Sequence, residues 1–280
     1  MKKILLPTDF SDNSWNAITY ALQLFKDESC HFTLLHTYTP IIYQVEFMQS
    51  SIPQFQVIEA VKETLKGKLD KLSQRIKTEF DNPRHQFVER LSFNTLTEDI
   101  EALINKHKID FIIMGTKGAS GVKGVLFGSN TIHVIKNATC PVLAVPSDFD
   151  FETPYELLFP SDYEVAFKEH HIKPVIAIAQ CYNVRVNILH VHYGEQLTKE
   201  QEQNRSKLEA YFEDIAHLFH NIKNQSVPEA IDKFQLKTRI SMLVMLNNKR
   251  SFFENLFFKS NLNQIGFHLK VPFMVIPSSL

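Results

Sequence analysis

Short, continuous apolar runs alternate with stretches of helical periodicity along the first half of the chain. A run without polar alternation indicates a strand that is buried on both faces, which is typical of a parallel sheet. The pattern therefore predicts five parallel strands, each four to six residues long. They are expected at residues 3–6, 32–36, 86–91, 111–114 and 142–145.

Between these runs, apolar residues recur every three or four positions, as they do along the buried face of a helix. Such stripes occupy residues 15–25, 57–76 and 96–104. Ser11 or Asp12 is a suitable N-cap for the first of these helices. Because strands alternate with helices, the first half is expected to form an open, doubly wound α/β sheet with right-handed crossovers.

The second half of the chain repeats the first in three blocks that occur in the same order. Residues 4–9 recur at 157–162, residues 34–36 recur at 188–190, and residues 110–146 align without a gap to 241–277. We therefore expect two copies of one unit, at residues 1–147 and 154–280, joined by an acidic linker. In the second copy the helical stripe through residues 208–219 places His217 and His220 on a helix surface.

Five of the eight glycines fall within fourteen residues, at positions 115, 118, 121, 124 and 128. The segment directly follows one apolar run and leads into a helix that is expected to begin near Ser129. Glycine permits positive φ and close backbone approach, so the loop can aim several N–H groups at an anion, and the helix N-terminus adds more. With Lys117 and Lys123, these features indicate a phosphate-binding loop, and a plain connection is the alternative. Neither the Walker A nor the G-x-G-x-x-G pattern is present.

The spacing Gly115-x2-Gly118-x9-Gly128-Ser129 resembles the nucleotide loop of the universal stress protein (UspA-like) family. Three further family landmarks occur in order, at residues 7–11, 34–36 and 140–146. The resemblance covers the whole first copy and, in degraded form, the second. It implies an adenine nucleotide alpha hydrolase-like fold, with two five-stranded parallel sheets of order 3-2-1-4-5. It also implies that the copies pack through their fifth strands as an internal pseudo-dimer, which would cover an apolar edge strand.

In such a sheet a ligand binds between strands one and four, where the winding reverses. In nucleotide-binding members of the family, the positions that match Asp9 and Thr37 lie beside the adenosine, and the matching glycines, with Ser129 and Asn130, surround ribose and phosphates. The site that the resemblance implies consists of Pro7, Thr8, Asp9, Thr37, Met114, Gly115, Gly118, Gly128, Ser129 and Asn130. From the residues alone, Asp9 could instead cap the first helix, and both roles can coexist.

The second copy departs from this pattern. Leu246, Lys249 and Lys259 replace the three key glycines, and their side chains would fill the phosphate space. We therefore expect the second copy not to bind nucleotide. Elsewhere, His190 and His192 share one face of a strand without a nearby cysteine or acidic partner, so a structural pair is favoured over a metal site.

The leading hypothesis is a stress-response sensor or regulatory protein that binds ATP, with or without Mg²⁺, in its first copy. A slow ATP-hydrolysing enzyme and a non-binding structural protein are the alternatives. The loop offers lysine and serine but no carboxylate for a metal ion, so binding is favoured over phosphoryl transfer, and no catalytic or metal-binding residue is assigned.

Composition narrows the class of protein further. The net charge of −1 argues against a dedicated nucleic-acid-binding protein. Three widely spaced cysteines form no disulfide framework, and the first apolar run is too short for a signal peptide. No stretch approaches the length of a membrane span. We therefore expect a cytoplasmic protein, as an internal pseudo-dimer with or without further homo-oligomerisation.

Overall fold

The computed structural model describes residues 1–38, 54–117, 127–247 and 270–278. Gly118, the two glycines at 121 and 124, and Lys123 therefore lie outside the described residues, as do Lys249 and Lys259 of the second half. The strands of the described residues are β1 (Lys2–Pro7), β2 (Cys30–Tyr38), β3 (His85–Phe93), β4 (Phe111–Gly115), β5 (Val142–Val145), β6 (Glu156–Pro160), β7 (Arg185–His192), β8 (His217–Lys223), β9 (Met242–Asn247) and β10 (Phe273–Pro277). The helices are α1 (Asp12–Leu24), α3 (Gln54–Glu79), α4 (Leu96–His107), α5 (Ser129–Asn137), α6 (Glu169–Tyr182), α7 (Lys199–Tyr211) and α8 (Val227–Lys237).

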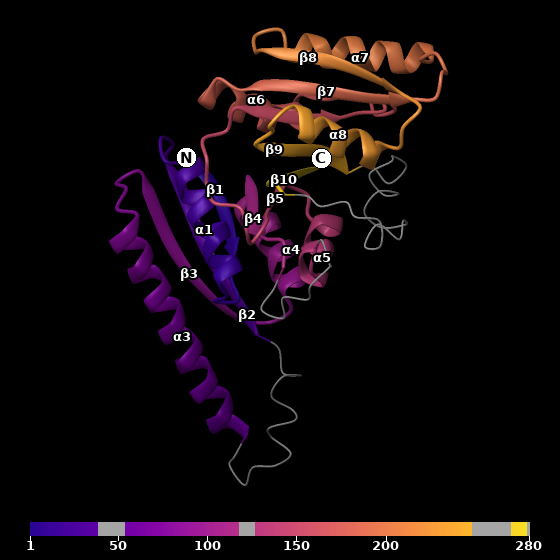
Figure 1. The fold of residues 1–280 in the computed structure, drawn as a ribbon. Coiled ribbons are helices and arrows are strands. Elements are labelled where there is room, and N and C mark those ends of the chain that lie inside the picture. Colours follow the sequence, from indigo (N-terminus) through magenta and orange to yellow (C-terminus); the bar gives the residue numbers. More distant parts are fainter. Residues whose placement is uncertain (39–53, 118–126, 248–269, 279–280) are drawn as a thin grey trace.

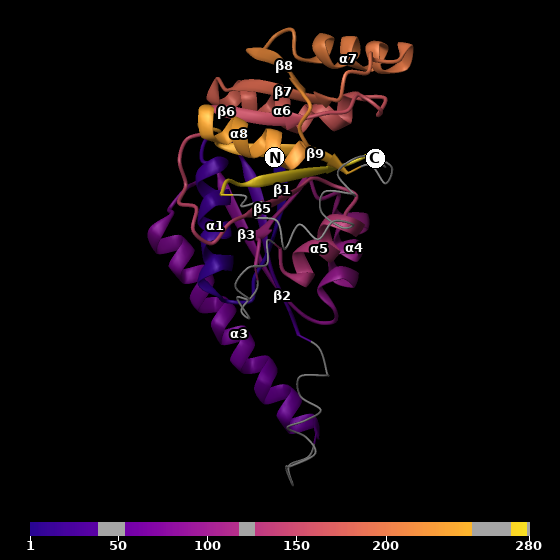
Figure 2. The ribbon, with the colours of Figure 1, turned by 45° about the vertical axis from the view of Figure 1, so that its right-hand side comes forward.

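The strands form one continuous sheet in the order β3-β2-β1-β4-β5-β10-β9-β6-β7-β8 (Figures 1 and 2). Within each half the neighbouring strands are parallel, and both halves show the order 3-2-1-4-5. The expected fold class is therefore confirmed. One detail differs from the expectation: the two halves do not form two separate sheets, because their fifth strands join them into one.

The junction between the halves is antiparallel. Phe273 lies opposite Ala144, and Met274 lies opposite Leu143. Leu143 and Met274 are 1% and 0% exposed, so both fifth strands are buried where they meet. As expected for an apolar edge strand, each one is covered, and here the partner is the other half of the same chain.

Two layers of helices cover the sheet, and each encloses one hydrophobic cluster. The helices α1, α3, α6 and α7 pack on one face, whereas α4, α5 and α8 pack on the other (Figure 1). Each cluster includes residues from both halves. The core therefore continues across the junction on both faces of the sheet.

The linker between the halves is packed against α1. Asn16 donates its side-chain amide to the carbonyl oxygens of Pro146 and Phe149, at 2.9 and 3.1 Å. The ring of Phe151 lies edge-on to Tyr20, with 5.3 Å between centroids. At the far end of α1, the Tyr182 hydroxyl donates to a terminal carbonyl of that helix. Helix α1 thus contacts both the linker and α6.

The expectation of a helix through residues 208–219 was wrong. Helix α7 ends at Tyr211, and His217 begins β8, which pairs with β7 over seven residue pairs. The helical spacing of apolar residues continues by coincidence past the end of α7. The edge strand is hard to recognise because one side has no neighbouring strand in the described chain and Leu218 is 46% exposed. His217 and His220 therefore lie on a strand.

Candidate functional site

A cavity of about 290 Å³ lies at the carboxyl ends of β1 and β4, where the strand order reverses. It brings together segments that are far apart in sequence: the turn after β1, the end of β2, and the start of the glycine-rich loop with the start of α5. Its lining residues are Pro7, Thr8, Asp9, Ser14, His36, Thr37, Leu96, Met114, Gly115, Lys117, Gly128, Ser129, Asn130 and Thr131.

The structure brings every sequence-predicted site residue to this cavity except Gly118, which lies outside the described residues. Sequence reasoning missed Ser14, His36, Leu96 and Thr131. Ser14 and Thr131 lie in the first turns of α1 and α5, so helix geometry could have suggested them. Leu96 begins α4 and carried no chemical signal.

The turn after β1 is built by local hydrogen bonds. The Asp9 carboxylate accepts from the N–H and the hydroxyl of Ser11, at 3.0 and 2.5 Å. The Ser11 hydroxyl in turn accepts from the Ser14 N–H and so caps α1. Asp9 is therefore the Asx-type support of this helix that the residues alone suggested, and it also lines the cavity.

His36 faces the cavity in a defined protonation state. Its Nδ1 lies 2.7 Å from the Thr8 carbonyl oxygen, and because a carbonyl only accepts, Nδ1 is the protonated nitrogen. Burial lowers the pKa of this imidazole, although the Thr8 contact opposes the effect. The ring of Phe10, which adopts a left-handed φ of 63°, lies 4.4 Å from the imidazole. Burial therefore favours the neutral form of His36, in which Nε2 is an acceptor.

The second half repeats this arrangement. Nδ1 of His190 lies 2.9 Å from the Ser161 carbonyl, and the ring of Tyr163, at a φ of 57°, stacks on the imidazole at 4.8 Å. The backbone N–H of each aromatic residue donates to the side-chain hydroxyl two residues earlier, that of Thr8 or Ser161. The repeat that sequence comparison detects thus extends to the conformation of individual side chains.

The ends of the glycine-rich loop are held by hydrogen bonds to three successive backbone carbonyls, those of residues 115–117. The hydroxyl of Thr131 donates to the Gly115 carbonyl at 2.9 Å, and the Gly128 N–H donates to the Thr116 carbonyl at 2.7 Å. A third hydrogen bond is donated by the Asn13 side-chain amide to the carbonyl of Lys117. Gly128 has a φ of −66°, and of the described glycines only the one at position 194 has a positive φ. At Gly115 close approach, rather than positive φ, accounts for the glycine, because an added Cβ would collide with the Asn13 side chain.

The N-terminus of α5 opens onto the cavity. Its N-cap is Gly128, which has no side chain to accept from the first N–H groups, whereas α1, α4, α7 and α8 are capped by hydroxyl groups. Unsatisfied N–H groups and the helix dipole favour an anion at such a position. The Ser129 and Lys117 side chains belong to the same end of the cavity. This end can hold phosphate groups.

The corresponding position in the second half is almost filled. There, a void of only about 10 Å³ lies beside Ser161 and Asp162, and Val165, Phe167 and Leu246 close it. A drug-sized ligand needs a few hundred Å³. The void that the described residues of the second half form at this position is therefore far smaller than a nucleotide needs.

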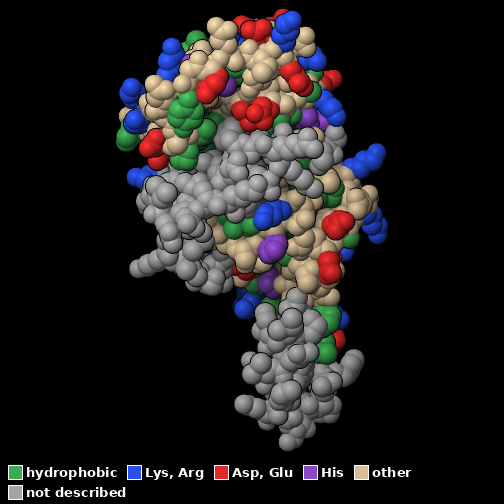
Figure 3. Space-filling view, turned by 90° about the vertical axis from the view of Figure 1, so that its right-hand side faces the viewer, with side chains coloured by type: hydrophobic (Ala, Val, Ile, Leu, Met, Phe, Trp, Pro, Cys, Tyr) green, Lys and Arg blue, Asp and Glu red, His purple; other side chains and the backbone are tan. Residues whose placement is uncertain are grey.

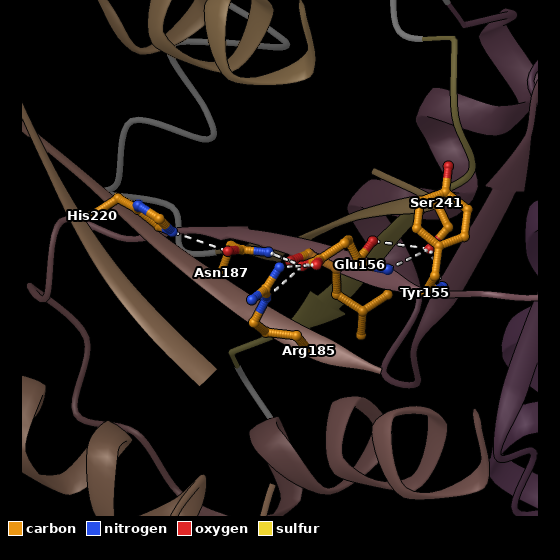
Figure 4. A network of polar contacts seen from close by, with 7 residues as sticks. Tyr155, Glu156, Arg185, Asn187, His220 and Ser241 are labelled. Carbon is orange, nitrogen blue, oxygen red and sulfur yellow. Dashed lines mark hydrogen bonds and ion pairs between the residues drawn. The ribbon is translucent and has the colours of Figure 1, made fainter. Parts of the chain in front are cut away.

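A separate polar network lies at the opposite end of the second half of the sheet, where β6 and β7 begin (Figure 4). Arg185 and Asn187 both donate to the Glu156 carboxylate, and the Asn187 side-chain oxygen lies 2.9 Å from Nε2 of His220. The Ser241 hydroxyl donates to the Glu156 carbonyl at 2.9 Å. The network connects β6, β7 and β8 with the residue before β9, and it lies away from the carboxyl ends where these sheets bind ligands, so we interpret it as structural.

Metal-binding and membrane-spanning features can also be assessed in the described residues. Among the described residues, no group of three or more His, Cys, Asp or Glu side chains is arranged to hold a metal ion. No helix in the described part of the chain is long and apolar enough to cross a membrane. On the face shown in Figure 3, the cationic and anionic side chains of the described residues are interspersed.

Comparisons with known proteins agree with this fold. The sequence model of the universal stress protein family matches residues 1–146. A universal stress protein of Methanocaldococcus jannaschii is 32% identical over 148 residues, which are 51% of this chain and 81% of the relative. A second one from this archaeon is 27% identical over 154 residues, 51% of this chain and 94% of that protein. The crystal structure of a universal stress protein from Archaeoglobus fulgidus covers 98% of this chain and 96% of its own, with 18% identity and a TM-score of 0.69, and so shares the fold. On these matches, the chain belongs to the universal stress protein family.

Proposed function

We propose that this chain is a tandem universal stress protein that binds an adenine nucleotide, ATP, in residues 1–147 and acts as a sensor or regulatory protein in a stress response. Residues 154–280 are then a degenerate copy that completes the sheet. The observation that carries the proposal is the cavity between β1 and β4, because two segments with independent sequence signals line it together.

The two ends of the cavity suit the two ends of a nucleotide. The open N-terminus of α5, with Ser129 and Lys117, offers N–H, hydroxyl and ammonium donors to the phosphates. At the other end, Asp9 and the neutral His36 offer acceptors to the hydroxyl and amino groups of an adenosine. Asp9 is the one acidic side chain among the described lining residues. Mg²⁺, where present, would therefore be held mainly by the phosphates.

The first experiment is to purify the chain without added ligand, denature it, and identify any nucleotide that it releases. Calorimetric titration of the nucleotide-free chain with ATP should then give a stoichiometry near one. A stoichiometry near two would contradict the interpretation of the second half, and no binding of ATP, ADP or AMP would contradict the proposal.

A matched pair of variants assigns the site to the first half. Asp9 and Asp162 occupy equivalent positions, and the carboxylate of each accepts a hydrogen bond from the N–H two residues later. Asp9→Ala should weaken ATP binding, whereas Asp162→Ala should leave it unchanged. Equal effects of the two variants would mean that the carboxylates act only through the stability of the fold.

A further inference from the structure

Asn13, in the first turn of α1, holds the start of the glycine-rich loop. Its side-chain amide donates to the carbonyl oxygen of Lys117, a residue 104 positions further along the chain. Asn13 is only 8% exposed, and it is not among the residues that line the cavity. The contact therefore approaches the loop from the buried side of α1 and not from the cavity.

Gly115 makes room for this contact. A Cβ atom added at Gly115 would lie 2.4 Å from Nδ2, 2.6 Å from Cγ and 2.8 Å from Oδ1 of Asn13. All three distances are shorter than carbon makes with any non-bonded atom, and the three nearest atoms all belong to Asn13. A side chain at position 115 would therefore displace the Asn13 amide and break its bond to Lys117.

The second half lacks both members of this pair. Leu246 occupies the position of Gly115, since it lies opposite Ile276 as Gly115 lies opposite Val145. Helix α6 begins at Glu169, seven residues after Asp162, whereas α1 begins three residues after Asp9. The helical turn that carries Asn13 is thus missing where the glycine is missing and where the cavity is nearly filled.

Stability alone does not account for an asparagine at this position. Its Oδ1 is buried and accepts no hydrogen bond from the described residues. A buried acceptor without a donor destabilises a fold, and such a group calls for a separate explanation. Holding the loop through Nδ2 supplies one.

We propose that Asn13 is a positioning residue of the nucleotide site, which fixes residues 115–117 so that the loop and the N-terminus of α5 present their donors together. This inference rests on the proposed function of the loop as a phosphate-binding element. Without the amide, residues 115–117 must be fixed when the ligand binds, and the affinity falls. One lost buried hydrogen bond corresponds to about a tenfold loss of affinity.

The test compares ATP affinity by calorimetry in Asn13→Ala, Gly115→Ala and the double variant. Asn16→Ala is the matched control, because Asn16 lies in the same helix and its amide donates to linker carbonyls instead of the loop. Each single variant at positions 13 and 115 should bind about tenfold more weakly, and the control should bind as the parent does. The double variant should bind no more weakly than Asn13→Ala, because both changes remove the same bond.

The melting temperature separates positioning from stability. Gly115→Ala should destabilise the chain in the presence of Asn13 and much less in the Asn13→Ala background, where the clash is absent, but affinity should stay low in the double variant. Parental affinity in Asn13→Ala, or strictly additive losses in the double variant, would overturn the proposal. Should Asn13→Ala fold poorly, Asn13→Leu, which keeps a similar volume and removes the donor without adding a charge, takes its place.

A ligand-free measurement distinguishes failure of this inference from failure of the proposed function. Hydrogen exchange of peptides that contain residues 115–117 should be faster in Asn13→Ala than in Asn16→Ala. If the parent binds no nucleotide, the proposed function fails, and this exchange difference still decides whether Asn13 holds the loop. Equal exchange in the two variants would overturn the inference.

Discussion

Phe273 at the junction of the two halves provides a direct test of whether the chain folds as one unit. Its ring is fully buried in β10, opposite Ala144 of the first half. It also lies 5.8 Å from the ring of Phe127, the residue that precedes the N-cap of α5. Phe273→Ala therefore removes a side chain of the second half that packs against the first half close to the candidate site.

The expected loss follows from burial. Replacing a fully buried phenylalanine by alanine costs about 3–5 kcal/mol, because the transfer free energy is lost and a cavity remains. With a urea dependence of about 3 kcal/mol per molar, the midpoint of unfolding should fall by about 1–2 M. Phe273→Leu keeps most of the volume, and its cost should stay below about 1.5 kcal/mol.

The assay uses the single tryptophan of the chain. Trp15 lies in α1, where its ring is edge-on to Phe80 and Arg75 stacks on it, so its fluorescence reports the first half. Far-UV circular dichroism reports the helices of both halves. Since both hydrophobic clusters cross the junction, the two signals should give one coincident transition in the parent and an equal shift in Phe273→Ala.

An unshifted Trp15 transition in Phe273→Ala, together with a shifted circular dichroism signal, would refute this reasoning. It would mean that the halves unfold independently and that the β5–β10 pairing contributes little. Two separate transitions in the parent would lead to the same conclusion.

Three further predictions concern the site and the pH dependence of stability. Gly128→Val should lower ATP affinity by more than tenfold with little loss of stability, as measured by calorimetry and thermal melting, because the backbone at φ −66° accepts valine while the side chain obstructs the N-terminus of α5. ATP turnover should lie far below the ~10 s⁻¹ of ordinary enzymes; turnover near that rate that is lost in Asp9→Ala would favour the enzyme alternative. His171 is 1% exposed, and burial, followed by the charge of His170, lowers its pKa from 6.5 to about 4. As the pH falls, the imidazole at position 171 is therefore protonated in the unfolded chain before it is protonated in the folded one. The stability that the neutral, buried His171 contributes is complete above pH 6.5 and is lost between pH 6.5 and about 4. His171→Gln should flatten the fall in urea-unfolding free energy over that range by up to roughly 3 kcal/mol, and an unchanged pH profile would contradict this assignment.

Local sequence patterns were sufficient to predict the strands of the first half, and the family resemblance supplied the strand order of both halves. Buried parallel strands leave continuous apolar runs, and amphipathic helices leave a regular stripe, so both can be identified without knowledge of distant contacts. The glycine cluster and the turn after β1 identified the two sides of the cavity for a similar reason. In a doubly wound sheet, the ends of strands one and four must meet.

The same patterns failed where neighbouring elements determine the outcome. His217 begins a strand because β7 supplies hydrogen bonds along one side of it, although the apolar spacing before it is helical. Packing of the halves through their fifth strands was expected, but their merging into one sheet depends on the antiparallel register in which Leu143 meets Met274, and nothing local to either strand specifies that register. Likewise, Gly115 looks like any loop glycine until the structure places the Asn13 side chain against it. Contacts between residues about a hundred positions apart depend on how the elements pack, and a pattern read over ten or twenty residues contains no record of them.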